Sequence, residues 1–469
     1  MEASNLQIYW HESQPIYSVC FQPNDAKRPK LLTAGGDNRV RAWMLNFEKD
    51  NHMKVDTIDF LSSLTQHEQA VNVIRFNSTG EVLASAGDDG QLLLWRQNDE
   101  MVKEFGMDDV EFDDFKESWT VWKKIRSGSD AFEIYDLAWS PNDRYIVTAS
   151  MDNAVRIFDV EAGKRVVSVS DHNHYVQGVV WDPLDQYIFS QSADRALNVY
   201  EIVRDSGDNT IIGLKLKNKI IKGDLPQRTD TQNFDLKTTK NCMLFHNETL
   251  PSFFRRAAIS PCGSLLCVPA GIFKSDTSNE VHNSVYIYTR AAIASSINRP
   301  IMCLPFLKRP AIAVSFNPNR YAVTTDQAYV QLPYKLVFAV ATSNELLIYD
   351  TESVQPLGIV GNLHYTPLTD LTWSQDGTLL MISSTDGFCS YVSLDQSILG
   401  TKIGTDSSSS VRTQAEGITT TQEGSKNVVN ILPVKRAGPT RDQGYGTGPK
   451  RIHPILIQDD QHEEQQQQQ

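Results

Sequence analysis

A short pattern of apolar runs separated by polar turns recurs along this chain and constrains its fold more than any other feature. In residues 67–95, HEQAVNVIRFNSTGEVLASAGDDGQLLLW, a first run ends at Phe76, a turn follows at 77–80, and a third run closes on Trp95. Alternating apolar residues joined by tight turns predict an antiparallel β-meander. A lone meander of this size cannot cover both faces of its sheet, so the unit needs neighbours of its own kind.

The first run and its turn occur in seven copies, which extend over nearly the whole chain to about residue 395. The copies read VCFQPND from Val19, VIRFNSTG from Val73, DLAWSPND from Asp136, VVWDPLD from Val179, AAISPCG from Ala257, AVSFNPN from Ala313 and DLTWSQDG from Asp370. This recurrence predicts an array of similar sheets that pack against one another.

A second signature places a histidine, a hydroxyl, an aspartate and an aromatic residue at fixed spacings. The aspartate precedes the aromatic by six residues in four copies, and the histidine precedes the aspartate by 22 residues in three copies and by 26 in the first. The members that we expect to act together are His11, Thr33, Asp37, Trp43, His67, Ser85, Asp89, Trp95, Asp152, His172, Ser190, Asp194, His364 and Asp386.

The residue types of this signature suit internal bracing. A buried carboxylate is costly unless its acceptor sites are filled, and an imidazole, a hydroxyl and turn amides can fill them. A catalytic triad is the alternative interpretation of His67, Ser85 and Asp89. An enzyme normally has one triad, whereas this set recurs, so we predict a structural role and no catalytic residues.

These strand-turn units and turn aspartates resemble the WD40 repeat family, whose units are four-stranded propeller blades. The resemblance implies an all-β fold, with a seven-bladed WD40 β-propeller over residues 1–400 and inserts near 104–118, 204–250 and 274–283. Leu6–Trp10 precedes the first full copy. We expect it to supply the outer strand of the last blade, because ring closure protects sheet edges.

The overall composition limits the classes of function. There is no run of about 18 apolar residues and no basic, apolar leader after Met1, so we expect a protein that is neither membrane-bound nor secreted. The six cysteines lack metal-ligand spacing, which predicts reduced core thiols, an intracellular compartment and no metal or cofactor. The net charge of −13 argues against strong DNA binding by the propeller and favours basic protein partners.

Two stretches of the repeat region are candidate contact surfaces. The first, within residues 107–117, carries Asp108, Asp109, Asp113 and Asp114 with the aromatic residues Phe112 and Phe115. It is either a solvated insert, as most charge runs are, or an acidic lip that engages a basic partner. The second, SFFRR at 252–256, places Phe253, Arg255 and Arg256 at a strand entry. These residues form either a surface contact or a core phenylalanine with arginines stacked on the rim.

The character of the sequence changes at about Thr401. Low apolar content, no periodicity and a final glutamine run predict a disordered tail over residues 401–469. Within it, GPKRIHPILI at 448–457 is an apolar strip opened by two cations. In extended conformation Ile452, Pro454 and Leu456 project to one side, which suits capture of a partner by strand addition. A chance apolar patch or a weak nuclear-import element is the alternative.

Four stretches, YVQGVVWDP, SFFRR, LPYKLVFAVAT and SSTDGFCS, resemble the WD40-bearing middle subunits of the chromatin assembly factor complex. That resemblance implies a nuclear, chromatin-associated and non-enzymatic subunit of a histone chaperone. Such a chaperone deposits the central histone pair of the nucleosome on newly replicated or repaired DNA. The implied partners are the large subunit and the second WD40 subunit of the complex, together with core histones.

The strip at 449–457 resembles the B-domain-type motif with which such subunits bind the anti-silencing histone chaperone. On this resemblance, Lys450 and Arg451 pair with acidic groups of the partner, whereas Ile452 and Leu456 fill its groove. Pro454 removes one ladder donor but is tolerated at a sheet edge.

Two other functions stay open, namely a HIR-type subunit for replication-independent nucleosome assembly and a WD40 substrate receptor of a ubiquitin ligase. The chain lacks the sequence motifs of phosphate-binding loops, zinc proteases and serine hydrolases, which argues against an enzyme.

Overall fold

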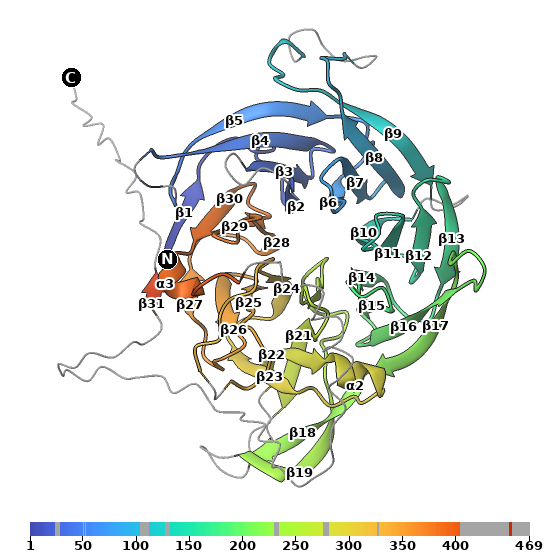
Figure 1. Ribbon diagram of the computed structural model, residues 1–469, viewed down its shortest axis with the longest axis vertical. Helices are drawn as coiled ribbons and strands as arrows, with labels where there is room; N and C mark the ends of the chain where they lie inside the picture. The colour runs from blue at the N-terminus through green and yellow to red at the C-terminus, as the bar shows by residue number, and fades with distance from the viewer. Residues whose placement is uncertain are drawn as a thin grey trace, which may run out of the picture.

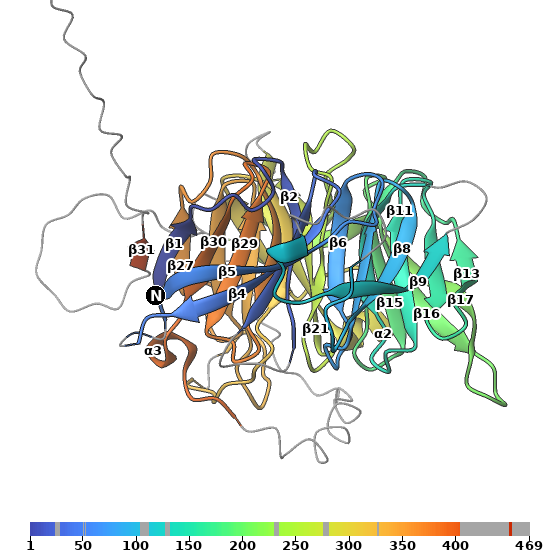
Figure 2. The same cartoon turned by 90° about the horizontal axis from the view of Figure 1, so that it is seen from above.

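The computed structural model describes residues 1–23, 29–49, 51, 53–103, 112–126, 132–228, 234–274, 281–325, 328–403 and 450–452. In this part of the chain, seven sheets of mainly antiparallel strands stand around a central axis like the blades of a propeller (Figure 1). Seen from the side, they form a thick disc (Figure 2). The predicted all-β, seven-bladed propeller is confirmed, whereas the predicted disorder concerns a tail that lies almost entirely outside the described residues.

Each blade runs from an innermost strand at the axis to an outermost strand at the rim. Blades one and two consist of β2 (Ile16–Phe21), β3 (Lys30–Gly35), β4 (Val40–Phe47) and β5 (Val55–Leu64), and of β6 (Val71–Phe76), β7 (Val82–Gly87), β8 (Gln91–Gln97) and β9 (Trp119–Arg126). Blades three and four consist of β10 (Ile134–Trp139), β11 (Tyr145–Ser150), β12 (Val155–Asp159) and β13 (Lys164–Val169), and of β14 (Val176–Trp181), β15 (Tyr187–Ser192), β16 (Leu197–Arg204) and β17 (Ile211–Ile220).

The remaining blades follow the same plan. Blades five and six consist of β20 (Ala258–Ile259), β21 (Leu265–Lys274), β22 (Val281–Thr289) and β23 (Met302–Leu307), and of β24 (Ala311–Phe316), β25 (Val337–Thr342), β26 (Glu345–Asp350), β27 (Gly358–Gly361) and β31 (Lys450–Ile452). Blade seven consists of β28 (Leu368–Trp373), β29 (Leu379–Ser384), β30 (Cys389–Ser393) and β1 (Glu2–Leu6). Outside the blades lie the hairpin β18 (Lys222–Arg228) and β19 (Phe234–Met243) and the short helices α2 (Arg290–Ala294) and α3 (Gln396–Leu399).

The amino-terminal strand closes the ring. β1 pairs antiparallel with β30, from Glu2 opposite Ser393 to Leu6 opposite Cys389 (Figure 1). The closing strand therefore ends at Leu6, where the sequence prediction had it begin. The segment after Leu6 turns inward instead, because Trp10 is fully buried and donates its indole N–H to the Leu6 carbonyl at 3.0 Å.

The insert predicted at 204–250 is shorter than expected. Residues Ile211–Ile220 form β17, the outermost strand of blade four, because Ile211 and Ile220 are buried while Leu214 and Leu216 pack beside blade three. Only the hairpin β18–β19 projects from the disc, at the lower edge of Figure 1. Lysines alternate with apolar residues along β17, which is the pattern of a half-buried strand.

The hydrophobic core is divided among the contacts between blades. Seven clusters of buried side chains each join two neighbouring blades, including one between blades seven and one that seals the ring. In that cluster Trp10 packs edge-on against Trp43 with ring centroids 5.0 Å apart. Because every blade buries both faces against its neighbours, no blade has a complete core of its own.

The innermost strands share a local distortion. Six of the seven show a shift in register between their first and third residues, as between Ile16 and Ser18. A bulge re-aims the side chain beside it. The residues directly after the shift include Ser18, Asp136 and Asp370, whose side chains take part in a polar network at the axis.

Arg256 connects five blades through this axial network. It lies just before β20 in blade five, and its guanidinium donates to the carbonyl oxygens of Tyr17, Asn72 and Thr369 at 3.0, 2.8 and 3.0 Å. These three carbonyls belong to blades one, two and seven. The Arg256 amide also donates to the Ile312 carbonyl of blade six at 2.9 Å.

Two buried aspartates balance the positive charge at the axis. Asp370 lies 3.2 Å from Arg256 and 2.8 Å from Arg75, and it accepts the Ser18 hydroxyl at 2.7 Å. Asp136 lies 3.5 Å from Arg256 Nε. Burial raises the pKa of Asp136, and it would raise that of Asp370, but the Arg256 and Arg75 guanidiniums outweigh burial and lower the Asp370 pKa.

We expect Arg256→Met to lower the free energy of unfolding by about 3–5 kcal/mol, because the change leaves buried carboxylates undercompensated and three carbonyls without their donor. Urea denaturation of the full chain measures this loss. Arg165→Met, on the exposed surface of β13, is the matched control and should have little effect. Equal stability of the two variants would contradict the role given to the axial arginine.

Candidate functional site

The recurring polar signature lies at one face of the disc. We call this the mouth face, where the innermost strands begin; the helices α2 and α3 lie toward the opposite face (Figure 2). In blade two, His67 Nε2 is 2.6 Å from Ser85 Oγ and His67 Nδ1 is 2.8 Å from Asp89. Trp95 donates its indole N–H to the same Ser85 oxygen at 2.8 Å.

Blades one and four contain the same arrangement. His11 contacts Thr33 at 2.8 Å and Asp37 at 2.6 Å, and Trp43 donates to Thr33 at 2.9 Å. In blade four, the histidine, hydroxyl and aspartate are His172, Ser190 and Asp194, at 2.8 Å for the hydroxyl and 3.2 Å for the carboxylate.

Blades three and seven depart from this arrangement. In blade seven, His364 contacts Asp386 at 3.0 Å, but its hydroxyl partner is Ser390 on β30, at 2.8 Å. In blade three, Arg156 takes the place of the histidine and binds Asp152. The signal for that substitution was present, since an arginine four residues after a turn aspartate can fold back onto it.

The geometry gives these sets no access to a substrate. Ser85 is fully buried, and its hydroxyl is hydrogen-bonded both to the Trp95 indole N–H and to His67 Nε2, so it does not face solvent. Burial would raise the pKa of Asp89, but hydrogen bonding and charge interaction with His67 outweigh it and hold the pKa below its usual range. The same balance lowers the pKa of Asp37, Asp194 and Asp386.

The SFFRR stretch lies mostly inside the propeller, which corrects the expectation of a surface contact through its arginines. Arg255 and Arg256 are 0% and 3% exposed. Arg255 donates to the carbonyls of His246 and Asn247 at 2.6 and 2.5 Å, so its charge is used to hold a loop. Of this stretch, Phe253 alone is well exposed, at 62%.

The acidic stretch within 107–117 is described only in part. Asp108 and Asp109 lie outside the described residues, whereas Asp113 and Asp114 are exposed. The expected aromatic anchor Phe115 is buried and packs edge-on against Phe60, with centroids 5.8 Å apart. The stretch is therefore pinned to blade one, with its two described aspartates facing solvent.

A group of aromatic and acidic side chains surrounds the entrance to the axis on the mouth face. We define this mouth surface as Tyr17, Asp88, Glu133, Tyr135, Tyr175, Phe253 and Phe254. Tyr17 of blade one meets Phe254 of blade five edge-on at 6.0 Å, which caps the axis. Tyr135 and Tyr175, on blades three and four, meet edge-on at 6.1 Å.

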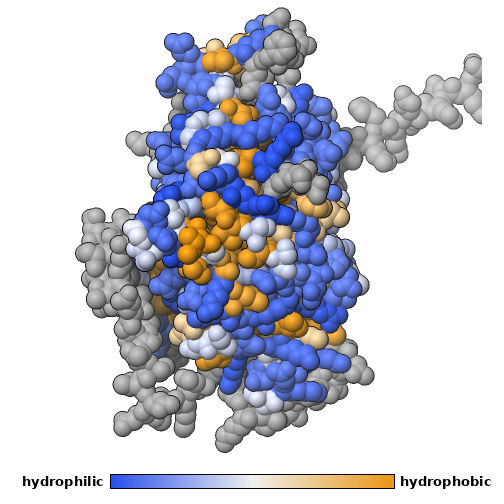
Figure 3. Space-filling model, turned by 90° about the vertical axis from the view of Figure 1, so that its right-hand side faces the viewer, coloured by the Kyte–Doolittle hydropathy of each residue, from blue (hydrophilic) through white to orange (hydrophobic). Residues whose placement is uncertain are grey.

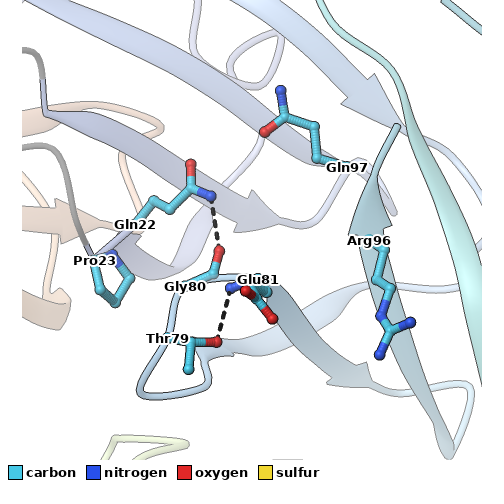
Figure 4. A pocket seen from close by; sticks show the side chains of 7 residues that line it. All are labelled: Gln22, Pro23, Thr79, Gly80, Glu81, Arg96 and Gln97. Carbon is cyan, nitrogen blue, oxygen red and sulfur yellow. Dashed lines mark hydrogen bonds between the residues drawn. The ribbon is translucent and has the colours of Figure 1, made fainter. Parts of the chain in front are cut away.

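Two further surfaces lie away from the mouth. A shallow, open groove of about 540 Å³ lies at the other end of the innermost strands, between blades one and two (Figure 4). Its lining includes Gln22, which donates to the Gly80 carbonyl at 2.8 Å, and Arg96. On the side of the disc that lies at the right of Figure 1, apolar residues are flanked by hydrophilic ones (Figure 3). Leu214 and Leu216 of β17 are partly buried against the core between blades three and four.

The tail returns to the rim of the propeller. β31 pairs in parallel with β27 as a fifth strand of blade six, with Lys450, Arg451 and Ile452 opposite Gly358, Ile359 and Val360 (Figure 1). Pro454 and Leu456 of the predicted motif lie outside the described residues. The backbone at 450–452 is thus extended and engaged at a sheet edge.

No group of three His, Cys, Asp or Glu side chains suited to hold a metal ion occurs among the described residues. All six cysteines are free, and burial raises the pKa of Cys20, Cys267, Cys303 and Cys389. None of the helices in the described ranges is long and apolar enough to cross a membrane.

Similarities to known proteins extend over the whole propeller. A family model described as the CAF1B/HIR1 beta-propeller domain matches residues 1–399. The B subunit of chromatin assembly factor 1 from Saccharomyces cerevisiae is 52% identical, over 97% of this chain and 100% of its own length. The corresponding protein of Gallus gallus is 36% identical, over 85% and 69%. Protein HIR1 of Yarrowia lipolytica is 25% identical, over 86% and 38%.

The bracing role of the polar sets can be measured in one pair of variants. Ser85→Ala removes the hydroxyl that accepts the buried Trp95 indole N–H and is hydrogen-bonded to His67 Nε2, and it should lower the free energy of unfolding by about 2–4 kcal/mol. Thr148→Val alters the equivalent position of blade three, where the buried Thr148 hydroxyl has no hydrogen-bond partner in the described structure, and should be neutral or stabilising. Chemical denaturation compares them. Equal losses in both variants would refute the bracing role.

Proposed function

The chain belongs to the CAF1B/HIR1 β-propeller family, and on this premise we propose that it is a non-catalytic scaffold subunit of a chromatin assembly factor complex. The observation that carries the proposal is the 52% identity to the Saccharomyces cerevisiae relative over 97% of this chain, which extends the similarity beyond the propeller. The complex would act in the nucleus and deposit the central histone pair of the nucleosome on newly replicated or repaired DNA. Its other members would be a large subunit and a second WD40 subunit.

The proposed mechanism divides the work between the propeller and the tail. The propeller docks on the large subunit, and the strip at 449–457 recruits an anti-silencing histone chaperone that carries histones. Strand addition requires an extended backbone, and the backbone at 450–452 has this conformation against β27. Lys450 and Arg451 would pair with acidic groups of the chaperone, while Ile452, Pro454 and Leu456 would occupy its groove.

Two features support a binding role over catalysis. The repeated His, Ser/Thr and Asp sets are buried in the turns, where their hydrogen bonds are made within the blade. The exposed Asp113 and Asp114 offer negative charge to a basic partner, in keeping with the net charge of −13.

A HIR-type assembly subunit is the second candidate. The observation in its favour is that the family model covers both groups and that HIR1 proteins match most of this chain. However, the HIR1 protein of Yarrowia lipolytica is only 25% identical, and the match spans 38% of its length.

We expect Ile452→Ala with Leu456→Ala to abolish recovery of the histone chaperone from nuclear extract while the large subunit and second WD40 subunit stay bound. The reason is that the two apolar anchors are lost, whereas every strand from β1 to β30 keeps its sequence. The measurement is affinity purification of tagged full chain with partners identified by mass, beside a version ending at residue 445.

The matched control for this experiment is Ile431→Ala with Leu432→Ala, an equivalent apolar pair elsewhere in the tail. It should recover every partner. Unchanged chaperone recovery with the motif variant would refute the proposal that the tail recruits the chaperone. Recovery of ligase adaptors in place of the two other subunits would sink the proposed complex.

A further inference from the structure

The mouth surface carries negative charge that no neighbouring cation of the described residues neutralises. Asp88 is half-buried in the turn after β7, and its Oδ1 accepts from the Asn72 amide at 2.6 Å. The Glu133 carboxylate, just before β10, accepts the Tyr135 hydroxyl at 3.0 Å. Within the described ranges neither carboxylate is paired with a lysine, arginine or histidine. Burial, together with Glu133 and Asp89 nearby, raises the pKa of Asp88.

This situation differs from that of the other buried carboxylates. The turn aspartate Asp89, directly after Asp88, is paired with His67 at 2.8 Å. At the axis, Asp136 and Asp370 are balanced by Arg75 and Arg256. Asp88 and Glu133 differ from these aspartates, because no described lysine, arginine or histidine forms an ion pair with either carboxylate. A cation from another molecule would be attracted by both carboxylates.

Aromatic rings complete the surface around these carboxylates. Tyr17 is close enough to Asp88 that burial and this charge together raise the tyrosine pKa. Burial and the charges of Glu133 and Asp88 likewise raise the pKa of Tyr135. Its ring meets that of Tyr175 with centroids 6.1 Å apart. Faces of aromatic rings attract ammonium and guanidinium groups, most strongly where water is partly excluded. Phe254 is already used in this manner, since Arg256 stacks on its ring at 4.0 Å.

The wall of the mouth also contains an unused acceptor. Gln177 is the second residue of β14, the position that Tyr17 and Tyr135 occupy in β2 and β10. It is 2% exposed and donates its amide to the Ser252 carbonyl at 2.7 Å. Its Oε1 has no hydrogen-bond partner in the described structure. A buried acceptor left open in this way is usually filled from outside the chain, by a water molecule or a ligand group, and this one is bonded through its own amide to Ser252, next to the exposed Phe253.

We propose that the mouth surface binds lysine or arginine side chains of an extended basic polypeptide, with Asp88 and Glu133 as counterions and the tyrosines and Phe253 as stacking partners. The site chemistry specifies the cation. That the polypeptide is the tail of a core histone rests on the proposed function. A histone segment would then reach the propeller directly, at a place separate from the chaperone-binding strip on the tail.

The test measures binding of a fluorescein-labelled peptide with the lysine- and arginine-rich amino-terminal sequence of a core histone to the full chain, by fluorescence anisotropy. The isosteric pair Asp88→Asn with Glu133→Gln should weaken binding at least about tenfold, or about 1.4 kcal/mol. Phe253→Ala, at an exposed position, should weaken it less. The control pair Glu81→Gln with Glu161→Gln, on exposed residues away from the mouth, should bind like the wild type.

A second peptide with its lysines acetylated separates charge from other contacts. Acetylation should weaken binding to the wild-type chain and change binding to the Asp88→Asn, Glu133→Gln variant much less. Peptide affinity within twofold of wild type in that variant, or an equal loss in the control pair, would overturn the inference. Thermal unfolding of each variant confirms that it is folded, and Glu133→Gln alone serves if the double variant is not.

The peptide titration does not depend on the chromatin assembly factor complex, because it uses no other subunit. Binding at the mouth with no recovery of the chromatin assembly subunits from extract would refute the proposed function and leave the cation site standing. Full recovery of those subunits with no peptide binding would refute the cation site alone.

Discussion

Arg256 reaches from blade five across the axis and donates hydrogen bonds to carbonyls of blades one, two and seven. Each hydrophobic cluster joins only two neighbouring blades, whereas the hydrogen bonds of Arg256 connect blades that share no cluster. The charge is tolerated at this depth because Asp136 and Asp370 lie within 3.5 and 3.2 Å of it. With the closing strand β1, this network turns seven similar sheets into one rigid body with a capped axis.

Rigidity of this kind suits a protein that works through its surface. The polar residues that resemble a catalytic triad form hydrogen bonds that brace the turns. Ser85, for example, is hydrogen-bonded to His67 and Trp95. Among the described residues, the exposed part of the mouth and the rim are available to partners. The mouth surface draws on blades one to five, whereas β31 lies on the outer edge of blade six, so the two proposed binding regions occupy different parts of the disc.

The sequence was informative wherever the signal was local. The strand-turn unit, the turn aspartates and their histidines are defined within a few dozen residues. Contacts between distant blades were not predictable in this way. Arg256 meets Asn72 and Thr369, 184 and 113 residues away, so its burial could not be foreseen from the neighbouring phenylalanines. The closing strand was misplaced because Glu2–Leu6 is largely polar and lacks a strand pattern.

On this proposal, one rigid propeller presents a basic-peptide site at its mouth, and the tail carries a separate chaperone-binding strip. The most direct measurement is titration of the basic histone-tail peptide into the full chain, alone and in the presence of saturating anti-silencing histone chaperone stripped of histones. Two independent sites predict the same peptide Kd in both titrations, with all three components in one complex by native mass spectrometry. Displacement of the peptide by the chaperone would contradict the account.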